Sequence, residues 1–210
     1  MKVSAILLKY KRINELNEII NSLKKQSAII DEILIFDNRK INLCGYWRYF
    51  GALNAKNDII YVQDDDVIVN NIPNLFKTYV NLKNQNNEQI VNNITKTGAK
   101  RYNGYNQTLM GWGSLYPKHS IKILNKYIAQ YGIDKLLLRD ISRIYTGLIN
   151  KWTNIIVTEG KEIMSFPSSS NKDSALCMEQ THEKNRIESI KLINFLKENN
   201  HENPCTIPLQ

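Results

Sequence analysis

The sequence predicts an α/β fold, in which a Rossmann-like, doubly wound, mostly parallel sheet carries helices on both faces. Short apolar runs of strand length alternate with longer runs of helical period over the first 85 residues. Polar or charged residues follow the short runs directly, and in such sheets ligands bind at the carboxyl ends of the strands. The 210 residues are expected to form a single domain, whether alone or within a longer polypeptide.

The first half of the chain supplies the regular part of this pattern. Strands are predicted where apolar residues run together, over 3–8, 33–36 and 59–62. Helices are predicted over 13–25, where apolar residues recur at helical spacing, and over 72–85. A loop and a short helix are predicted within 45–56. The helix over 72–85 has Pro73 in its first turn, where a missing backbone N–H is tolerated.

The second half is less regular and more polar. After one short strand, residues 95–107 are expected to form a mobile loop, and 108–117 a strand whose glycines permit close approach of backbone or ligand. Two helices are predicted next, over 119–131 and 134–150, followed by a strand over 154–160. Residues 166–174 are expected to form a flexible linker or lid, and 183–199 a last helix capped by Thr181.

Composition narrows the choice of compartment and partner. The net charge is +8, which invites nucleic acid, anionic membrane or a phosphorylated substrate as partner. The longest basic run is only "KYKR", residues 9–12, so dispersed surface lysines are the preferred explanation and no nucleic-acid partner is expected. Three scattered cysteines suit a reducing compartment, and no apolar run reaches the length of a signal sequence or membrane span. A cytoplasmic protein is expected.

The strongest chemical signal is "VQDDDVIV", in which Asp64, Asp65 and Asp66 follow a predicted buried strand. Adjacent carboxylates repel, and a divalent cation offsets that repulsion. Mg²⁺ or Mn²⁺ needs only one or two protein carboxylates when substrate phosphates and water complete its shell. The alternative is a solvated turn, since Asp also favours turns. The position between two apolar runs favours the metal site.

Other polar residues are predicted to reach the same rim. Arg12 follows the first strand, Asn38 follows the second, and Arg48 precedes the third. An arginine fork suits phosphate, and an amide can pair with a base such as uracil. Taken singly, each is better explained as a surface residue than as a ligand, but the three together at strand ends favour a binding site.

Further along, two groups stand out in helices. Asp140 lies mid-helix among apolar residues and needs a partner or a function, with an ion pair to Arg139 or Arg143 as the alternative. His182 and Arg186 are four residues apart and would share a helix face, where they would stabilise charge on a leaving diphosphate; a solvated helix start is the alternative.

Together these segments resemble a nucleotide-sugar glycosyltransferase of the GT-A fold, and most closely the exostosin-type retaining α-N-acetylhexosaminyltransferases. The matching segments are "ILLKYKR", "ILIFDN", "VQDDDVIV", "LMGWGSLYPK", "RDI" and "LCMEQTHEKNRIES". They cover roughly half of the chain and reach both ends. The triplet is of middling specificity alone; together with Gln180-Thr181-His182 and Arg186 it is much more specific.

The resemblance implies a role for each matched residue. The uridine and its phosphates would be held by Arg12, Asn38 and Arg48, with Asp64 and Asp65 at the nucleotide. Asp66, together with Asp64, would ligate Mn²⁺ or Mg²⁺. The catalytic residues would be Asp140, beside the anomeric carbon, and His182 and Arg186. These two would close over the diphosphate as part of a C-terminal closing segment.

The resemblance also implies a division of labour and leaves specificity open. Residues 1–92 would form the nucleotide-binding half and 93–210 the acceptor-binding half. Leu137 and Arg139 stand where the family has Asn and Glu that help to define the substrates, so the donor sugar and the acceptor are not transferred. The expected activity is metal-dependent hexosyl or deoxyhexosyl transfer from a UDP-sugar to a glycan or other hydroxyl acceptor, with a carbohydrate acceptor as the expected partner. It would retain anomeric configuration and serve surface or structural glycan synthesis. The alternative is a non-catalytic sugar-nucleotide or glycan-binding module.

Overall fold

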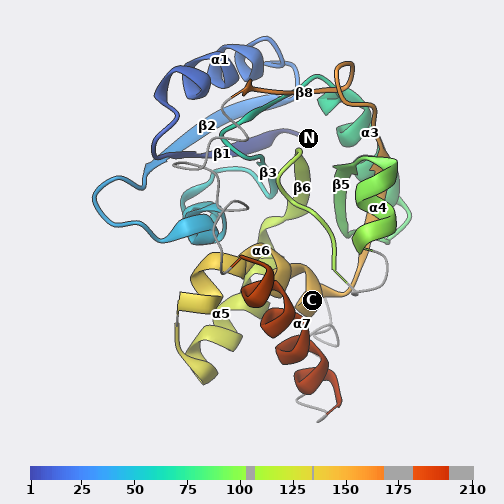
Figure 1. Ribbon diagram of the computed structural model, residues 1–210. Helices are drawn as coiled ribbons and strands as arrows, with labels where there is room; N and C mark the ends of the chain where they lie inside the picture. The colour runs from blue at the N-terminus through green and yellow to red at the C-terminus, as the bar shows by residue number, and fades with distance from the viewer. Residues whose placement is uncertain (103–106, 134, 168–181, 199–210) are drawn as a thin grey trace.

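The structure is a computed structural model of the chain (Figure 1). It describes residues 1–102, 107–133, 135–167 and 182–198. At 101, 135–139, 182–183, 185–186 and 196–198 it describes only the backbone. The predicted linker over 166–174 and the predicted cap Thr181 therefore fall almost wholly outside the described residues.

A six-stranded sheet forms the centre of the molecule. Its order is β2 (Ile30–Asp37), β1 (Val3–Lys9), β3 (Ile59–Val62), β6 (Ser114–Pro117), β5 (Ile90–Ile94) and β7 (Trp152–Ile156). β1 runs parallel to β2 and β3, β5 runs parallel to β7, and β6 is antiparallel to both of its neighbours. The predicted mostly parallel sheet is confirmed, with β6 as the one reversed strand.

Helices cover both faces of this sheet, as predicted (Figure 1). One face packs against α1 (Ile13–Lys24) and α3 (Ile72–Asn84), whose buried side chains include Leu16, Ile19 and Leu75. The other face packs against a set of shorter and C-terminal helices, namely η1 (Cys44–Tyr46), α2 (Trp47–Phe50), η2 (Gly51–Asn54), α5 (Ile121–Tyr131), α6 (Lys135–Ile149) and α7 (His182–Glu198). The short turn η4 (Lys118–Ser120) leads into α5. The two hydrophobic cores lie on opposite sides of the sheet and hold its strands in register.

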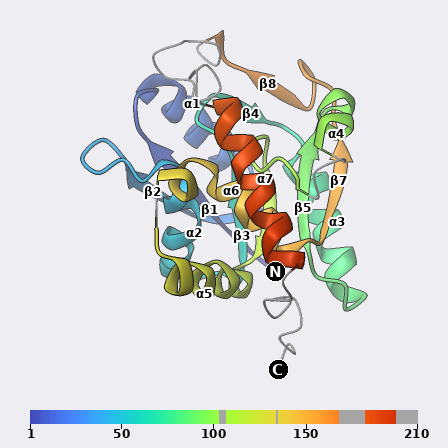
Figure 2. The same cartoon turned by 60° about the horizontal axis from the view of Figure 1, so that its bottom comes forward.

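The last helix lies across α6, as Figure 2 shows from below. Its side chain Ile193 is 1% exposed and packs into the core of that face. A Cβ added to Gly147 of α6 would lie 2.9 Å from Ile193 Cγ1, so the glycine permits this close approach. Ile187, in the first half of the same helix, is 43% exposed.

A small second sheet stands beside the acidic triplet. β4 (Val67–Val69) pairs antiparallel with β8 (Ile163–Ser165). The backbone N–H of Phe166 then donates to the carbonyl of Asp66 at 2.8 Å. The chain just after β8 is thus hydrogen-bonded to the turn that carries the triplet.

Two predictions for the second half are wrong. Residues 96–102 form a helix, α4 (Lys96–Tyr102), instead of a mobile loop; the N–H of Gly98 donates to Thr95 Oγ1 at 3.1 Å, which caps the helix start. The strand predicted over 108–117 is confined to 114–117, because Gly113 has a φ of +90° that breaks the extended backbone.

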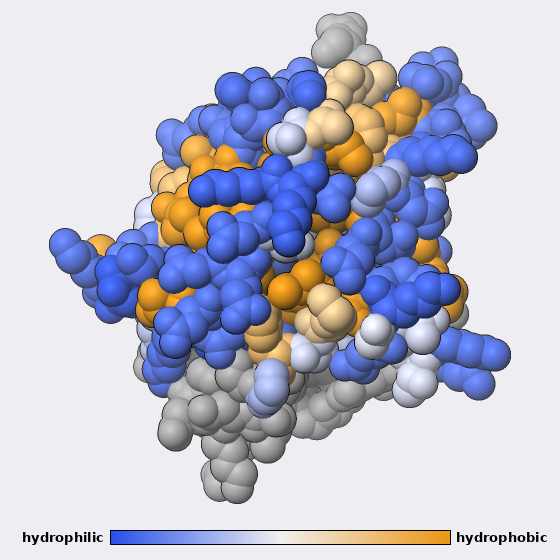
Figure 3. Space-filling model, turned by 90° about the horizontal axis from the view of Figure 1, so that it is seen from above, coloured by the Kyte–Doolittle hydropathy of each residue, from blue (hydrophilic) through white to orange (hydrophobic). Residues whose placement is uncertain are grey.

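Polar side chains dominate the surface seen from above, on the side of α1 (Figure 3). Apolar side chains appear there in small separate patches, which is ordinary for a protein surface. Within the described ranges, no helix combines the length and the apolar character that a bilayer span requires.

Candidate functional site

The carboxyl ends of β1 and β3 bring Arg12 and the acidic triplet together. Arg12 is 7% exposed, and its Nη1 lies 2.6 Å from Asp65 Oδ1 and 3.4 Å from Asp66 Oδ2. Fifty-three positions separate Arg12 from Asp65 in the sequence, so this contact exists only because the two parallel strands end at the same edge. The predicted convergence of strand ends is therefore present for these residues.

Arg48 reaches the same triplet from the opposite face of the sheet. It lies on α2 and forms an ion pair with Asp64, and its backbone carbonyl accepts a hydrogen bond from the Tyr116 hydroxyl at 2.6 Å. Burial alone would lower the pKa of Arg48, but the charge of Asp64 and the hydrogen bond to it raise the pKa. The guanidinium is therefore a fixed positive charge in the wall of the site.

The triplet is electrostatically strained despite these two arginines. Burial and the neighbouring charge of Asp64 raise the pKa of Asp66 to about 7, with Arg12 acting in the opposite direction. Burial likewise raises the pKa of Asp65, against the lowering effect of Arg12. Three carboxylates thus share two guanidinium groups, and an added cation at Asp66 would relieve the repulsion.

Gly111 lies directly against Asp64. The N–H of Asp64 donates to the Gly111 carbonyl at 2.7 Å, and a Cβ at position 111 would lie 1.9 Å from Asp64 Oδ2. No larger residue fits unless the Asp64 side chain moves. The sequence-based expectation that the glycines of "LMGWGSLYP" permit close approach is confirmed at this position.

Asp140 lies on α6, and it lines a cleft together with Arg48 and Asp64. It is 3% exposed, and its φ of −107° and ψ of 23° mark a kink in the helix. Arg143 Nε lies 3.1 Å from Asp140 Oδ1, so the ion pair considered from the sequence is present. The Arg143 guanidinium in turn lies over the ring of Tyr102, 5.4 Å from its centroid.

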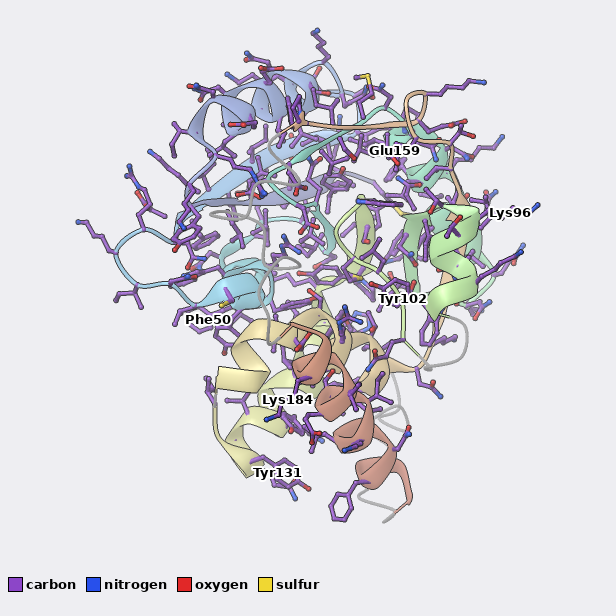
Figure 4. The ribbon with its side chains drawn as sticks, viewed as in Figure 1. Phe50, Lys96, Tyr102, Tyr131, Glu159 and Lys184 are labelled. Atoms are coloured by element: carbon purple, nitrogen blue, oxygen red, sulfur yellow. The ribbon has the colours of Figure 1, made fainter. Side chains whose placement is uncertain are left out.

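A cleft joins these groups. It is lined from the first half of the chain by Arg48 and Asp64, and from the second half by Tyr102, Asp140, Ser142, Arg143 and the 108–111 segment. In Figure 4, Tyr102 lies at the end of α4, and Lys96, at its other end, points outward. Sequence reasoning missed Tyr102 because its segment was predicted to be a loop, and it treated Arg143 only as an ion-pair partner.

Asn38 is used within its own loop. Its Nδ2 donates to Asn42 Oδ1 at 3.0 Å and to the Cys44 carbonyl at 3.1 Å, and its Oδ1 accepts from the Leu43 N–H at 2.8 Å. With an exposure of 3%, this side chain shapes the loop after β2. Its contact with a base stays a prediction.

His182 and Arg186 lie on α7, which begins at His182. Their side chains are outside what the structure describes, so their place relative to the cleft stays a prediction. In the part of the chain whose side chains are described, no three His, Cys, Asp or Glu residues form a cluster able to hold a metal ion by themselves. A metal at the triplet would therefore need further ligands from substrate or water.

Comparison with known proteins identifies the fold. No family model and no curated protein matches the sequence. S. aureus TarS 1–349 in complex with UDP matches with a TM-score of 0.57 at 12% identity, over 93% of this chain and 65% of that one. Glucosyl-3-phosphoglycerate synthase from Mycobacterium tuberculosis, in complex with Mn²⁺, UDP-glucose and phosphoglyceric acid, matches with a TM-score of 0.52 at 10% identity, over 90% and 80% of the two chains.

The fold is of the GT-A type. The mixed sheet with one reversed strand and helices on both faces agrees with these neighbours. The chain spans less than two thirds of the TarS structures, with 39% of the longer one covered. At identities of 10 to 12%, the match concerns the fold and leaves the closer resemblance to the exostosin-type family as a prediction.

Proposed function

We propose that this chain is a metal-dependent glycosyltransferase that moves a hexosyl or deoxyhexosyl group from a UDP-sugar to a hydroxyl of a carbohydrate acceptor, with retention of configuration, in glycan synthesis. One observation carries the proposal: a single cleft is lined by Arg48 and Asp64 on one side and Asp140 on the other. The matching GT-A structures, which hold UDP or UDP-glucose, add support from the fold.

The acidic triplet fits a divalent cation. Asp66 and Asp64 would hold Mn²⁺ or Mg²⁺, because their hard carboxylate oxygens lie on a turn with too little positive charge nearby. When bound, the ion would neutralise charge on the departing diphosphate. The described side chains offer no closed cage, so the donor phosphates would complete the shell.

The arginines would exchange partners when the donor binds. Arg12 and Arg48 now neutralise Asp65 and Asp64, which follow the strand end where a nucleotide diphosphate would bind. Their guanidinium forks match phosphate as well as carboxylate. His182 and Arg186 would add positive charge from α7, and Asn38 would hold the loop beside the base.

Asp140 would act at the sugar. Its carboxylate is buried, and Arg143 fixes its orientation through Nε, so it presents one defined face to the cleft. It can stabilise an oxocarbenium-like sugar, orient the acceptor hydroxyl or act as the nucleophile; in an inverting enzyme it would be the general base. Residues 1–92 would then bind the nucleotide, and 93–210 would bind the acceptor.

The test is release of UDP from a panel of UDP-sugars, with and without MnCl₂, alongside thermal shifts with UDP-, GDP- and dTDP-sugars. We expect a UDP-sugar with Mn²⁺ to raise the melting temperature and to be turned over. Stabilisation without turnover by any UDP-sugar, across a broad set of acceptors, would establish the non-catalytic binding module instead. The absence of stabilisation by every nucleotide sugar would refute both.

A further inference from the structure

A buried amide side chain supports the turn that carries the acidic triplet. Gln63 lies between β3 and Asp64 and is 2% exposed. Its Oε1 accepts a hydrogen bond from the Tyr61 hydroxyl at 2.7 Å, and its Nε2 donates to the Val67 carbonyl at 2.6 Å. A weaker contact at 3.4 Å joins Nε2 to the Asp64 carbonyl.

The chemistry of the partners fixes the orientation of this amide. The Val67 carbonyl can only accept, so the amide nitrogen must face it, and the oxygen must face Tyr61. Burial raises the pKa of Tyr61 well above its usual range, so its hydroxyl keeps the proton that it donates. Gln63 is therefore held at both ends in one orientation.

This contact closes the triplet turn from the inside. Val67 is the first residue after the triplet, so the Gln63–Val67 hydrogen bond connects the residues on either side of Asp64, Asp65 and Asp66. Two backbone hydrogen bonds hold the same turn from outside, Asp64 N–H to the Gly111 carbonyl and Phe166 N–H to the Asp66 carbonyl. The hydrogen bond across the interior of the turn thus comes from the Gln63 side chain, whereas the two outside it join backbone groups.

We propose that Gln63 is a positioning residue for the metal and donor site, which sets the direction of the triplet carboxylates without touching substrate. The inference rests on the proposed function, because it assumes that the triplet binds a metal ion and a nucleotide. Small cations demand near-ideal ligand geometry, and residues that orient ligands typically change metal affinity by about 10- to 100-fold when altered. A turn that loses its inner hydrogen bond would present Asp64 and Asp66 less accurately.

The chain offers a matched control in Asn93. Its Oδ1 accepts from Asn71 Nδ2 at 3.0 Å, and its Nδ2 donates to the Trp112 carbonyl at 3.1 Å. Like Gln63 it is buried, at 0% exposure, and it links a side chain to a backbone carbonyl. Its carbonyl partner lies outside the triplet turn. An effect that comes only from losing a buried amide should therefore be equal at the two positions.

The test compares Gln63→Met and Asn93→Leu, two substitutions of similar shape that remove both hydrogen bonds. Mn²⁺ binding is titrated by electron paramagnetic resonance in the presence of UDP, and stability is measured by urea unfolding of the same samples. We expect Gln63→Met to weaken Mn²⁺ binding by about 10-fold or more. Asn93→Leu should lose stability to a similar degree and keep the wild-type affinity.

Tyr61→Phe provides a second variant in case Gln63→Met does not fold. It removes the hydrogen bond from the Tyr61 hydroxyl to Gln63 Oε1 and leaves the amide against Val67, so Mn²⁺ affinity should fall by about threefold. Wild-type affinity in both Gln63→Met and Tyr61→Phe, or equal losses in Gln63→Met and Asn93→Leu, would overturn the role of Gln63 alone. A wild-type protein that binds neither Mn²⁺ nor UDP would overturn the proposed function and this inference together.

Discussion

Asp64 of the acidic triplet and Asp140 line one cleft. The charges of the triplet and of Asp140 are nevertheless balanced in different ways. The triplet carboxylates lie on a turn, at 21 to 37% exposure, and their arginines come from other elements. Asp140 is 3% exposed, and its partner Arg143 lies three residues along the same helix. One group is partly open with distant partners, whereas the other is closed with a local partner.

On the proposed function, this difference would separate donor and metal binding at the triplet from the transfer step at Asp140. A carboxylate whose partner belongs to another element can change partner when that element's arginine finds a phosphate. A carboxylate enclosed in its own helix with an adjacent arginine keeps one orientation, which suits a group that must face a reacting carbon. We therefore expect the triplet to govern donor and metal binding, and Asp140 to govern the transfer step.

The largest effects are expected from Asp66→Ala and Asp140→Asn. Each should lower UDP-sugar turnover by about 10³-fold or more, because one removes a metal ligand and the other a group at the sugar. Calorimetric titration of UDP with Mn²⁺ should separate them, with binding weakened in Asp66→Ala and kept in Asp140→Asn. Full turnover in either variant with excess metal would remove that residue from the site.

Gly111→Ala should come next. The new Cβ would meet Asp64 Oδ2, so this side chain must leave Arg48. We expect a stability loss of about 1–3 kcal/mol in urea unfolding and weaker donor binding. The same substitution in an Asp64→Ala background should cost much less, since the clashing atoms are gone. Equal costs in the two backgrounds would show that the clash lies elsewhere.

Arg12→Ala tests whether the triplet can exchange its cation. Removing this guanidinium leaves Asp65 and Asp66 short of positive charge, and the metal-free protein should lose about 1–3 kcal/mol of stability. Added MnCl₂ should then raise the melting temperature more than in the wild type. Arg39→Ala is the matched control, because its pair with Asp37 is exposed and should matter little. A smaller Mn²⁺ shift in Arg12→Ala than in wild type would contradict the exchange.

The last prediction concerns the pH dependence of stability. The pKa of Asp66 rises from 3.8 to about 7 on folding, so the folded protein binds more protons than the unfolded chain between these values. Its contribution to stability is present below about pH 4 and is lost as pH rises through 7. Without metal, the melting temperature should therefore fall across this window, and Asp66→Asn should flatten that part of the profile. Stabilisation by MnCl₂ should grow over the same range, because the metal needs the ionised carboxylate.

Local sequence patterns predicted the secondary structure correctly where the burial of an apolar run is enough to define the element. The strand at Ile59–Val62 matches its prediction residue for residue, because a fully apolar run before polar residues has one natural place in the sheet. β4 was not predicted as a strand, since its partner β8 begins 96 positions after Val67, at Ile163. α4 was missed because Gly98 and polar neighbours hide the capping signal of Thr95.

The candidate site was only partly accessible to sequence reasoning. Residue type and position predicted that Arg12, Arg48 and the triplet would meet, since strand ends share an edge. Their pairing with each other, and the kink at Asp140, depend on three-dimensional packing that no local pattern carries. Gln63 gave no signal, because an amide beside three carboxylates looks like one more polar residue until its burial is known.

The hydrogen bond from the Phe166 N–H to the Asp66 carbonyl has a consequence for folding during synthesis. The two residues are 100 positions apart, so the turn cannot acquire this outer support while the chain is still being synthesised up to that point. A nascent chain that has completed β1, α1, β2 and β3 would carry the aspartates without their finished frame. If the triplet binds a metal ion as proposed, that ability would arise late on the ribosome, after most of the domain has emerged.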